Sequence, residues 1–287
     1  MMNNTSRGFK LVQKFRKHKA EQGLPREFLG DPNLVNTKYD VISQKNLIKH
    51  SKEKIATVYS LLADEKSKLI FKQDLLSRKK GKDLMPPDCV DGYQHQYFDA
   101  DIISFVDNEI FIDAGAYDGT TTEFFMRYVG KANPKSILIE PDASVYDTMV
   151  SRMSVLELGN LEFINAALWN KSGKENFRLI PGGSSQIDKS AMEQVKTVAL
   201  DDLINEATFI KMDVEGAERQ ALEGAKQLIQ RCNPKLSIAI YHEPDDLWEV
   251  PITINKMNPN YKLYIRKYEG VPGYFLNEVV CYAIPSN

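Results

Sequence analysis

The stretch Phe111-Ile-Asp-Ala-Gly-Ala-Tyr-Asp-Gly119, followed at once by three threonines, decides the fold that we expect. The apolar run over residues 110–114 predicts a buried strand, and the glycines predict a tight turn at its end. A helix over residues 120–129 would begin beside this turn. Its free N–H groups and the positive end of its dipole suit a carboxylate or a phosphate.

The ligand of this turn can be inferred from its glycines and acids. A dinucleotide-binding turn has three glycines in the pattern G-x-G-x-x-G, with an acid about 20 residues further on. Here Gly115 and Gly119 are separated by three residues, the third glycine is absent, and Asp113 lies beside the turn. An acid at this place suits a cationic ammonium group, such as that of S-adenosylmethionine. A strand–turn–helix unit with purely structural glycines is the alternative.

Strands and helices alternate outward from this turn. The other predicted strands cover residues 136–140, 161–167, 209–213, 236–241, 261–266 and 279–284. Further helices are predicted over residues 144–156 and 216–231. This alternation favours an α/β fold with a mostly parallel sheet covered on both faces, whose strands all end at one edge. Ligands bind at that edge, near the point where the strand order reverses.

Polar residues follow the second and third of these strands. Glu140 lies 27 residues beyond Asp113, and its two carboxylate oxygens could accept both hydroxyls of a ribose. A solvated acid before a proline turn is the alternative. After the third strand, Asn165 could hydrogen-bond the edge of a purine, and Ala166 leaves room for a flat base. Ordinary packing explains these small residues equally well.

Acids gather after the fourth strand, in Phe209-Ile-Lys-Met-Asp-Val-Glu-Gly-Ala-Glu218. The helix dipole explains acids in a first helical turn, but Asp213 ends a strand at the functional edge and is therefore predicted as a site residue. Beyond the fifth strand, His242 is a candidate proton acceptor near neutral pH. Together with Glu215 and Glu243, these residues could instead hold a hard divalent cation. We predict a site without a metal.

Composition narrows the class of protein. No run of about 18 apolar residues is present, so no transmembrane helix is predicted. The three cysteines, Cys89, Cys232 and Cys281, are scattered, which argues against a disulfide framework and a zinc site. A reducing cytoplasm fits best. No nucleic-acid-binding motif is visible.

Charge is distributed unevenly along the chain. Residues 1–90 hold 19 Lys and Arg against 10 Asp and Glu, whereas the remainder holds 18 against 29. The first twenty residues suggest a basic helix, which either lies on a membrane or partner or is an ordinary first helix. Residues 23–32 read as a linker and residues 51–80 as helical. We therefore expect a helical extension or cap over residues 1–95, able to support a homo-oligomer, and a catalytic domain over residues 96–287.

Several of these segments together resemble the FkbM-type methyltransferases. They are FIDAGAYDG, ILIEPD, residues 162–169, the Leu200-Asp-Asp-Leu203 segment and FIKMDVEGAE, and the resemblance covers roughly residues 97–285. It implies a Rossmann-like class I sheet of seven strands, the last antiparallel. It also implies that S-adenosyl-L-methionine is used to methylate a hydroxyl, commonly of a sugar or polyketide.

The resemblance assigns roles by position. The cofactor loop matches Asp113, Gly115, Ala116, Tyr117 and Gly119, the ribose acid matches Glu140, and the acidic block matches Asp213, Glu215, Gly216 and Glu218. Many methyltransferases have a glycine where this chain has Tyr117, and the family often has an asparagine there.

The reaction expected is an in-line displacement in which a substrate oxygen attacks the sulfonium methyl group. His242 and Asp213 are the predicted bases, with Glu215 third, and Asp213 is also expected near the cofactor together with Asn165 and Ala166. Two rivals remain. One is an NAD(P)-dependent oxidoreductase, and the other is a non-catalytic binding protein with a degenerate methyltransferase fold.

Overall fold

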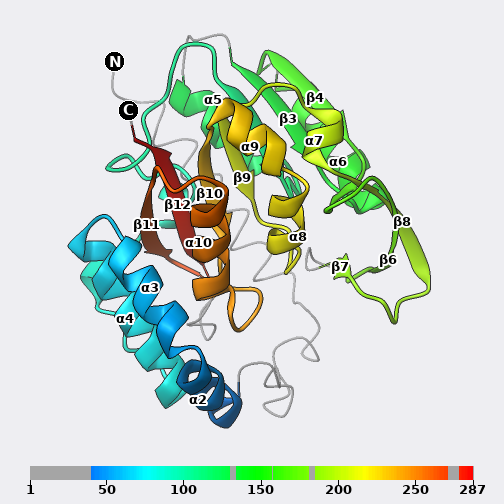
Figure 1. The fold of residues 1–287 in the computed structure, drawn as a ribbon. Coiled ribbons are helices and arrows are strands. Elements are labelled where there is room, and N and C mark those ends of the chain that lie inside the picture. The colour runs from blue at the N-terminus through cyan, green and yellow to red at the C-terminus, as the bar shows by residue number, and fades with distance from the viewer. Residues whose placement is uncertain (1–39, 130–133, 157, 181–184, 271–277, 287) are drawn as a thin grey trace.

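The computed structural model describes residues 40–129, 134–156, 158–180, 185–270 and 278–286 (Figure 1). Its main sheet has eight strands in the order β1-β11-β12-β10-β9-β2-β3-β4. These strands are β1 (Val90–Asp91), β2 (Ile110–Ala114), β3 (Lys135–Ile139), β4 (Asn160–Ile164), β9 (Phe209–Met212), β10 (Lys235–Ala239), β11 (Tyr261–Tyr268) and β12 (Val279–Pro285).

The strand order confirms the predicted sheet. Strands β2, β3, β4, β9 and β10 run parallel, and β12 runs antiparallel between β10 and β11. Strand β1 adds a two-residue eighth strand beside β11. Because β2 pairs with β3 on one side and with β9 on the other, the strand order reverses at β2. The C-terminal ends of β2, β3 and β9 therefore meet where such sheets bind ligands.

Six α-helices follow β2 among the described residues. They are α5 (Thr120–Val129), α6 (Ala143–Ser154), α7 (Leu200–Leu203), α8 (Glu218–Glu223), α9 (Lys226–Cys232) and α10 (Asp246–Met257). The prediction of a single helix over residues 216–231 was wrong, because this segment is divided at Gly224 into α8 and α9. The Asp201 carboxylate accepts the N–H groups of Gln227 and Leu228 at 3.0 and 2.7 Å and so begins a new helix.

A second sheet was not predicted. It has the order β5-β8-β6-β7, with β5 (Ala167–Leu168), β6 (Gly173–Arg178), β7 (Gln186–Ile187) and β8 (Glu193–Val198). The strand predicted over residues 161–167 is accordingly split, since β4 ends at Ile164 and Ala167 begins β5. Strand β6 reads GKENFR, a mostly polar pattern without the alternation that signals a strand.

Alternate residues of the central strands pack on opposite faces of the main sheet. Ile112 and Ile210 belong to the core under α8, α9 and α10. Phe111 and Phe209 face α5. The Phe111 ring lies 4.4 Å from the ring of Phe125 on α5 and 5.1 Å from the ring of Phe209. This two-residue period places position 113 of β2 and position 211 of β9 on the α5 face as well.

Three helices of the N-terminal segment, α2 (Val41–His50), α3 (Lys52–Leu61) and α4 (Glu65–Lys80), lie beside β11 (Figure 1). Ile70 and Phe71 share the core of the main sheet. The helix predicted over residues 51–80 is interrupted where Asp64 accepts the Ser67 N–H at 2.7 Å and begins α4. The predicted basic helix and the linker over residues 23–32 lie outside the described residues, and the division at residue 95 stays a prediction.

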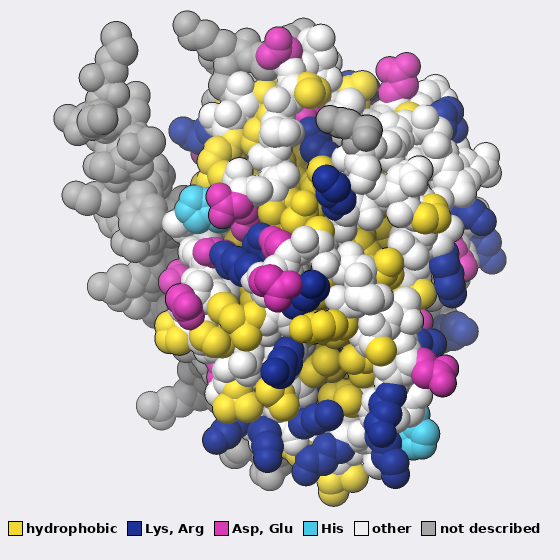
Figure 2. Space-filling view, turned by 60° about the vertical axis from the view of Figure 1, so that its left-hand side comes forward, with side chains coloured by type: hydrophobic (Ala, Val, Ile, Leu, Met, Phe, Trp, Pro, Cys, Tyr) yellow, Lys and Arg dark blue, Asp and Glu magenta, His cyan; other side chains and the backbone are white. Residues whose placement is uncertain are grey.

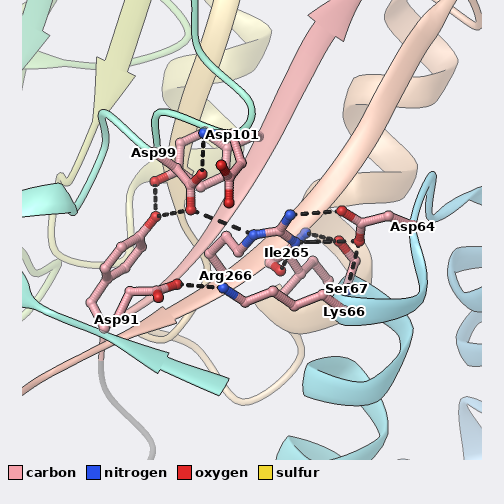
Figure 3. A network of polar contacts seen from close by, with 10 residues as sticks. Asp64, Lys66, Ser67, Asp91, Asp99, Asp101, Ile265 and Arg266 are labelled. Atoms are coloured by element: carbon pink, nitrogen blue, oxygen red, sulfur yellow. Dashed lines mark hydrogen bonds and ion pairs between the residues drawn. The ribbon is translucent and has the colours of Figure 1, made fainter. Parts of the chain in front are cut away.

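A polar network fixes α4 on the sheet (Figure 3). The Arg266 guanidinium on β11 contacts Asp64 at 2.6 Å and donates to the Ser67 hydroxyl at 2.9 Å. Nearby, Lys66 pairs with Asp91 of β1 at 2.8 Å. Across the described ranges, no helix has the length and apolarity that a membrane span requires. All three cysteines are free thiols.

Candidate active site

The turn after β2 is held by backbone geometry that favours glycine. Gly115, Tyr117 and Gly119 have φ values of 71°, 51° and 79°. A Cβ atom on Gly115 would lie 1.8 Å from the backbone oxygen of Asp213, so no side chain fits there. The glycine thus permits the ends of β2 and β9 to approach each other.

Asp113 is completely buried beneath this turn. Its carboxylate lies 3.0 Å from the Lys211 ammonium and accepts the Thr122 hydroxyl at 2.7 Å. Lys211 also donates to the backbone oxygens of Ala114 and Gly115, at 3.1 and 2.7 Å. The Asp113 carboxylate thus contacts side chains of the protein. This arrangement disfavours the predicted direct contact between Asp113 and a ligand ammonium. It indicates instead that Asp113 stabilises the turn from the interior of the protein.

Lys211 is charged in spite of its burial. Burial alone would lower the pKa of the ammonium, but the carboxylates of Asp113 and Asp213 outweigh this effect and raise the pKa above its ordinary value. Asp113 and Lys211 are also direct partners in the register of β2 and β9. The pair therefore joins two neighbouring strands at the ligand edge.

Glu140 lies at the tip of β3, as predicted. One carboxylate oxygen accepts the Tyr117 N–H at 3.0 Å, and the other accepts the Asp142 N–H at 2.9 Å. Burial raises the pKa of this carboxyl group, although both backbone hydrogen bonds oppose the rise. The Glu140 side chain is thus held in one orientation beside the turn.

The remaining predicted cofactor residues lie around Glu140 and the turn. Asn165 is exposed and donates to the backbone oxygens of Glu140 and Pro141, at 2.8 and 3.2 Å. The Ala166 side chain packs into the core near β3, and Ala116 packs against residues of α6. Asn165 therefore fixes the backbone of the loop after β3.

A second group of side chains lies one strand away, after β9 and β10. We call it the acid–histidine cluster and define it as Asp213, Glu215, Glu218 and His242. His242 Nε2 lies 3.3 Å from Asp213 and 3.5 Å from Glu215, whereas Nδ1 lies 2.8 Å from Glu218. The Asp213 N–H donates to the Ala114 oxygen at 3.1 Å, so the cluster adjoins the turn after β2.

Local backbone geometry assembles this cluster. Glu215 and Gly216 have φ values of 54° and 95° and form the turn between β9 and α8. Glu218 is the first residue of α8, and its carboxylate accepts the Val214 N–H at 3.0 Å. The structure thus brings together all three predicted catalytic residues. Glu218 lies among them, although the sequence-based prediction attributed acids in the first turn of this helix to the helix dipole alone.

Burial and charge set the protonation of the cluster. Burial alone would lower the pKa of His242, but Glu218, with support from the other two acids, raises this pKa to about 10. Burial raises the pKa of Glu215 to about 7, against the attraction of His242. An imidazole with protons on both nitrogens has no lone pair for another proton. This state disfavours the predicted role of His242 as the proton acceptor.

The same donor atoms could hold a cation. One atom each of Asp213, Glu215 and His242 lies within 4.8 Å of the other two. A proton on His242 Nε2 would already supply positive charge between the two carboxylates. Because a metal would have to displace this proton, the geometry is compatible with a metal without requiring one.

The sequence did not single out Tyr97 or Tyr241. The Tyr97 hydroxyl donates to Asp213 at 2.8 Å, and the Tyr241 hydroxyl donates to the same carboxylate at 3.4 Å. Ser237 of β10 holds Tyr97 by donating to its backbone oxygen at 3.0 Å. Tyr97 precedes the first predicted strand and belongs to no recognisable motif. Lys211 belongs to the FIKMDVEGAE segment, but the sequence of this strand does not indicate that its lysine is buried.

Comparisons with known proteins agree with this geometry. The sequence profile of the Methyltransferase FkbM domain matches residues 113–268. A methyltransferase FkbM from Methylobacillus flagellatus superimposes with a TM-score of 0.70 at 23% identity, covering 82% of this chain and 59% of that protein. This chain thus spans about three fifths of the length of that methyltransferase. The likeness shows that the fold is shared.

Two further solved structures resemble the chain at lower TM-scores. Fibrillarin from Aeropyrum pernix, with natively bound S-adenosyl-L-methionine, gives 0.39 at 13% identity, covering 64% of this chain and 70% of that protein. An SAH-bound methyltransferase from Podospora anserina gives 0.37 at 9% identity, covering 62% of this chain and 72% of that protein. No curated protein sequence matches the chain.

Proposed function

Because the chain belongs to the FkbM methyltransferase domain family, we propose that it moves a methyl group from S-adenosyl-L-methionine to a hydroxyl of a sugar, glycan or polyketide-like small molecule. One observation carries this proposal. The glycine turn after β2, the fixed Glu140 and the acid–histidine cluster all lie at the edge where the strand order reverses. A cofactor site and a source of proton acceptors are thereby adjacent.

The residues at this edge suit the parts of such a cofactor. Each Glu140 oxygen accepts one backbone N–H, which leaves further lone pairs for the two ribose hydroxyls. The first turn of α5 offers N–H groups and a positive dipole end to a carboxylate. We place the purine beside the exposed Asn165, whereas Ala166, whose side chain is buried in the core, contributes only by leaving room for a flat base. Asp113, through Lys211, acts as a positioning residue for the turn.

S-adenosyl-L-methionine would supply the electrophilic methyl group when bound. The chain's own task is to align the acceptor oxygen, which accounts for about 7–11 kcal/mol of barrier reduction in well-oriented reactions. It must also remove the hydroxyl proton during attack. We propose that the Glu215 carboxylate accepts this proton. The Asp213 carboxylate already accepts hydrogen bonds from Tyr97 and Tyr241, which occupy both of its oxygens.

His242 then has an electrostatic role. As a cation it attracts Asp213 and Glu215, and Glu218 holds its ring in place. Neutralising His242 would leave two carboxylates side by side without a positive charge between them. We therefore propose that the protonated His242 keeps Glu215 oriented toward the acceptor.

These assignments predict a bell-shaped dependence of kcat/KM on pH. Activity should rise as Glu215 loses its proton around pH 7 and fall as His242 loses its proton around pH 10. Initial rates of methyl transfer measured across this range test the prediction. In His242→Gln the descending limb should disappear, whereas His50→Gln, an exposed histidine on α2, should keep the wild-type profile. A rising limb that follows Asp213→Asn but not Glu215→Gln would contradict the assignment.

The function itself is tested by supplying labelled S-adenosyl-L-methionine and a panel of sugar and polyketide alcohols. Label should reach an oxygen of one acceptor class, with or without a chelator of divalent cations. Loss of activity with the chelator, restored by a divalent metal, would support the metal alternative. Stabilisation by NAD instead would favour an oxidoreductase. Cofactor binding without turnover of any acceptor would favour a non-catalytic protein.

A further inference from the structure

A groove lies among the three N-terminal helices, on the side of the sheet that carries β11. We call it the lysine groove. Its volume is about 510 Å³, within the range of small-molecule sites. It is lined by Lys45, Ile48, Lys49, Lys52, Ile55, Ala56, Tyr59, Phe71, Lys72, Leu75 and Lys79. Apolar side chains from all three helices thus line it together with five lysines.

The apolar lining reaches into the core. Phe71 is fully buried and Ile48 nearly so, and both belong to the main hydrophobic cluster. Ile55 and Leu75 are partly buried against the same cluster. Tyr59 keeps 43% of its surface exposed. The accessible apolar surface of the groove therefore comes from Tyr59 and Ala56, with parts of Ile55 and Leu75, above a floor of buried side chains.

The five lysines of the groove form no ion pair with any acid in the part of the chain that the structure describes. By contrast, Lys54 and Lys66 of the same helices pair with Glu249 and Asp91. Helices α2, α3 and α4 together hold ten Lys and Arg against three Asp and Glu. In the space-filling view, basic side chains gather around apolar surface at the lower edge of this face (Figure 2). An anionic group is the complement of such a rim.

The charge of the first twenty residues is not complementary to this rim. Residues 1–20 carry six Lys and Arg and no Asp or Glu, the same sign as the rim. An apolar surface with a cationic rim instead matches a molecule that joins an acyl chain to an anionic headgroup. Lysines near an anionic bilayer are attracted by its negative surface potential.

We propose that the lysine groove binds an anionic phospholipid at a bilayer surface, with the acyl chain along Ile55, Tyr59 and Leu75 and the phosphate among the lysines. Long lysine side chains can cover apolar groups with their methylenes while their ammonium groups reach a headgroup. Docking through this groove is independent of the proposed methyl transfer, because it determines where the chain binds and leaves its chemistry unchanged.

Sedimentation of the full chain with vesicles tests the proposal. Vesicles of phosphatidylcholine and phosphatidylglycerol in equal parts should bind the protein, and vesicles of phosphatidylcholine alone should not. Replacing Lys45, Lys49 and Lys72 together by Gln should weaken binding about a hundredfold. As a matched control, the triple Gln variant of Lys174, Lys189 and Lys196 loses equal charge near the second sheet and should bind as wild type.

A second pair of variants separates the groove from diffuse surface charge. Ala56 lines the groove and its neighbour Thr57 does not, although both are exposed on α3. Ala56→Glu should weaken vesicle binding much more than Thr57→Glu, and inorganic phosphate should not compete. Equal effects of the two variants, or of the two lysine triples, would overturn the proposal. So would a groove variant that alters only self-association, which would assign the surface to a second copy of the chain.

Discussion

Replacing Gly115 by alanine is expected to lower kcat/KM for methyl transfer at least about a hundredfold, the loss that a misplacement of about 1 Å produces. A Cβ atom would lie 1.8 Å from the Asp213 oxygen, so the ends of β2 and β9 must separate. The left-handed backbone, with φ of 71°, adds about 1–2 kcal/mol of strain for any residue with a side chain. Both effects displace the turn and the acid–histidine cluster together.

Initial rates and the affinity for S-adenosylhomocysteine measure this effect, and circular dichroism shows whether the variant folds. Gly173→Ala is the matched control, because a Cβ atom there would meet Thr197 at an ordinary 3.8 Å. Wild-type affinity and rate in Gly115→Ala would mean that the approach of the two strands does not shape the site.

Replacing Lys211 by methionine is expected to reduce the free energy of unfolding by about 3–5 kcal/mol. The Lys211 side chain is 2% exposed and that of Asp113 is 0% exposed, so the variant leaves a buried carboxylate without its cation. It also removes the donor to the Ala114 and Gly115 oxygens. Cofactor affinity should fall with stability, because the turn loses its support from below.

Denaturant unfolding measures the change. Lys135→Met is the matched control, since Lys135 pairs with Glu162 at the surface and such pairs contribute about 0–1 kcal/mol. Adding Asp113→Asn to Lys211→Met should recover part of the lost stability, because the buried charge is then removed. If Lys211→Met costs no more than the surface variant, the buried pair does not hold the turn.

Much of the fold could be predicted because its signals are local. The apolar strand before the glycine turn and the helix over residues 120–129 are confirmed, since burial of a central strand and a helix start are both visible in a few residues. Asp213, Glu215 and His242 were placed at one edge by topology alone. The structure brings them together, and their catalytic roles stay proposals.

The remainder depends on contacts between distant segments. The second sheet contains mostly polar strands. Their pairing depends on the chain leaving the main sheet between β4 and β5. The break between α8 and α9 depends on Asp201, a residue in another element. Neither the burial of Asp113 against Lys211 nor the approach of Tyr97 to Asp213 leaves a pattern in the sequence. The protonation of His242 likewise follows from three acids that only folding brings near.

The central claim is that the edge formed by β2, β3 and β9 binds a sulfonium nucleoside. Isothermal titration calorimetry of the full chain with S-adenosylhomocysteine and with NAD tests this claim most directly. The account predicts one S-adenosylhomocysteine per chain, no measurable NAD binding, and an affinity about 10–100-fold weaker in Glu140→Gln, as expected when hydrogen bonds to a charged group are lost. Binding of NAD in place of S-adenosylhomocysteine, or an unchanged affinity in Glu140→Gln, would contradict it.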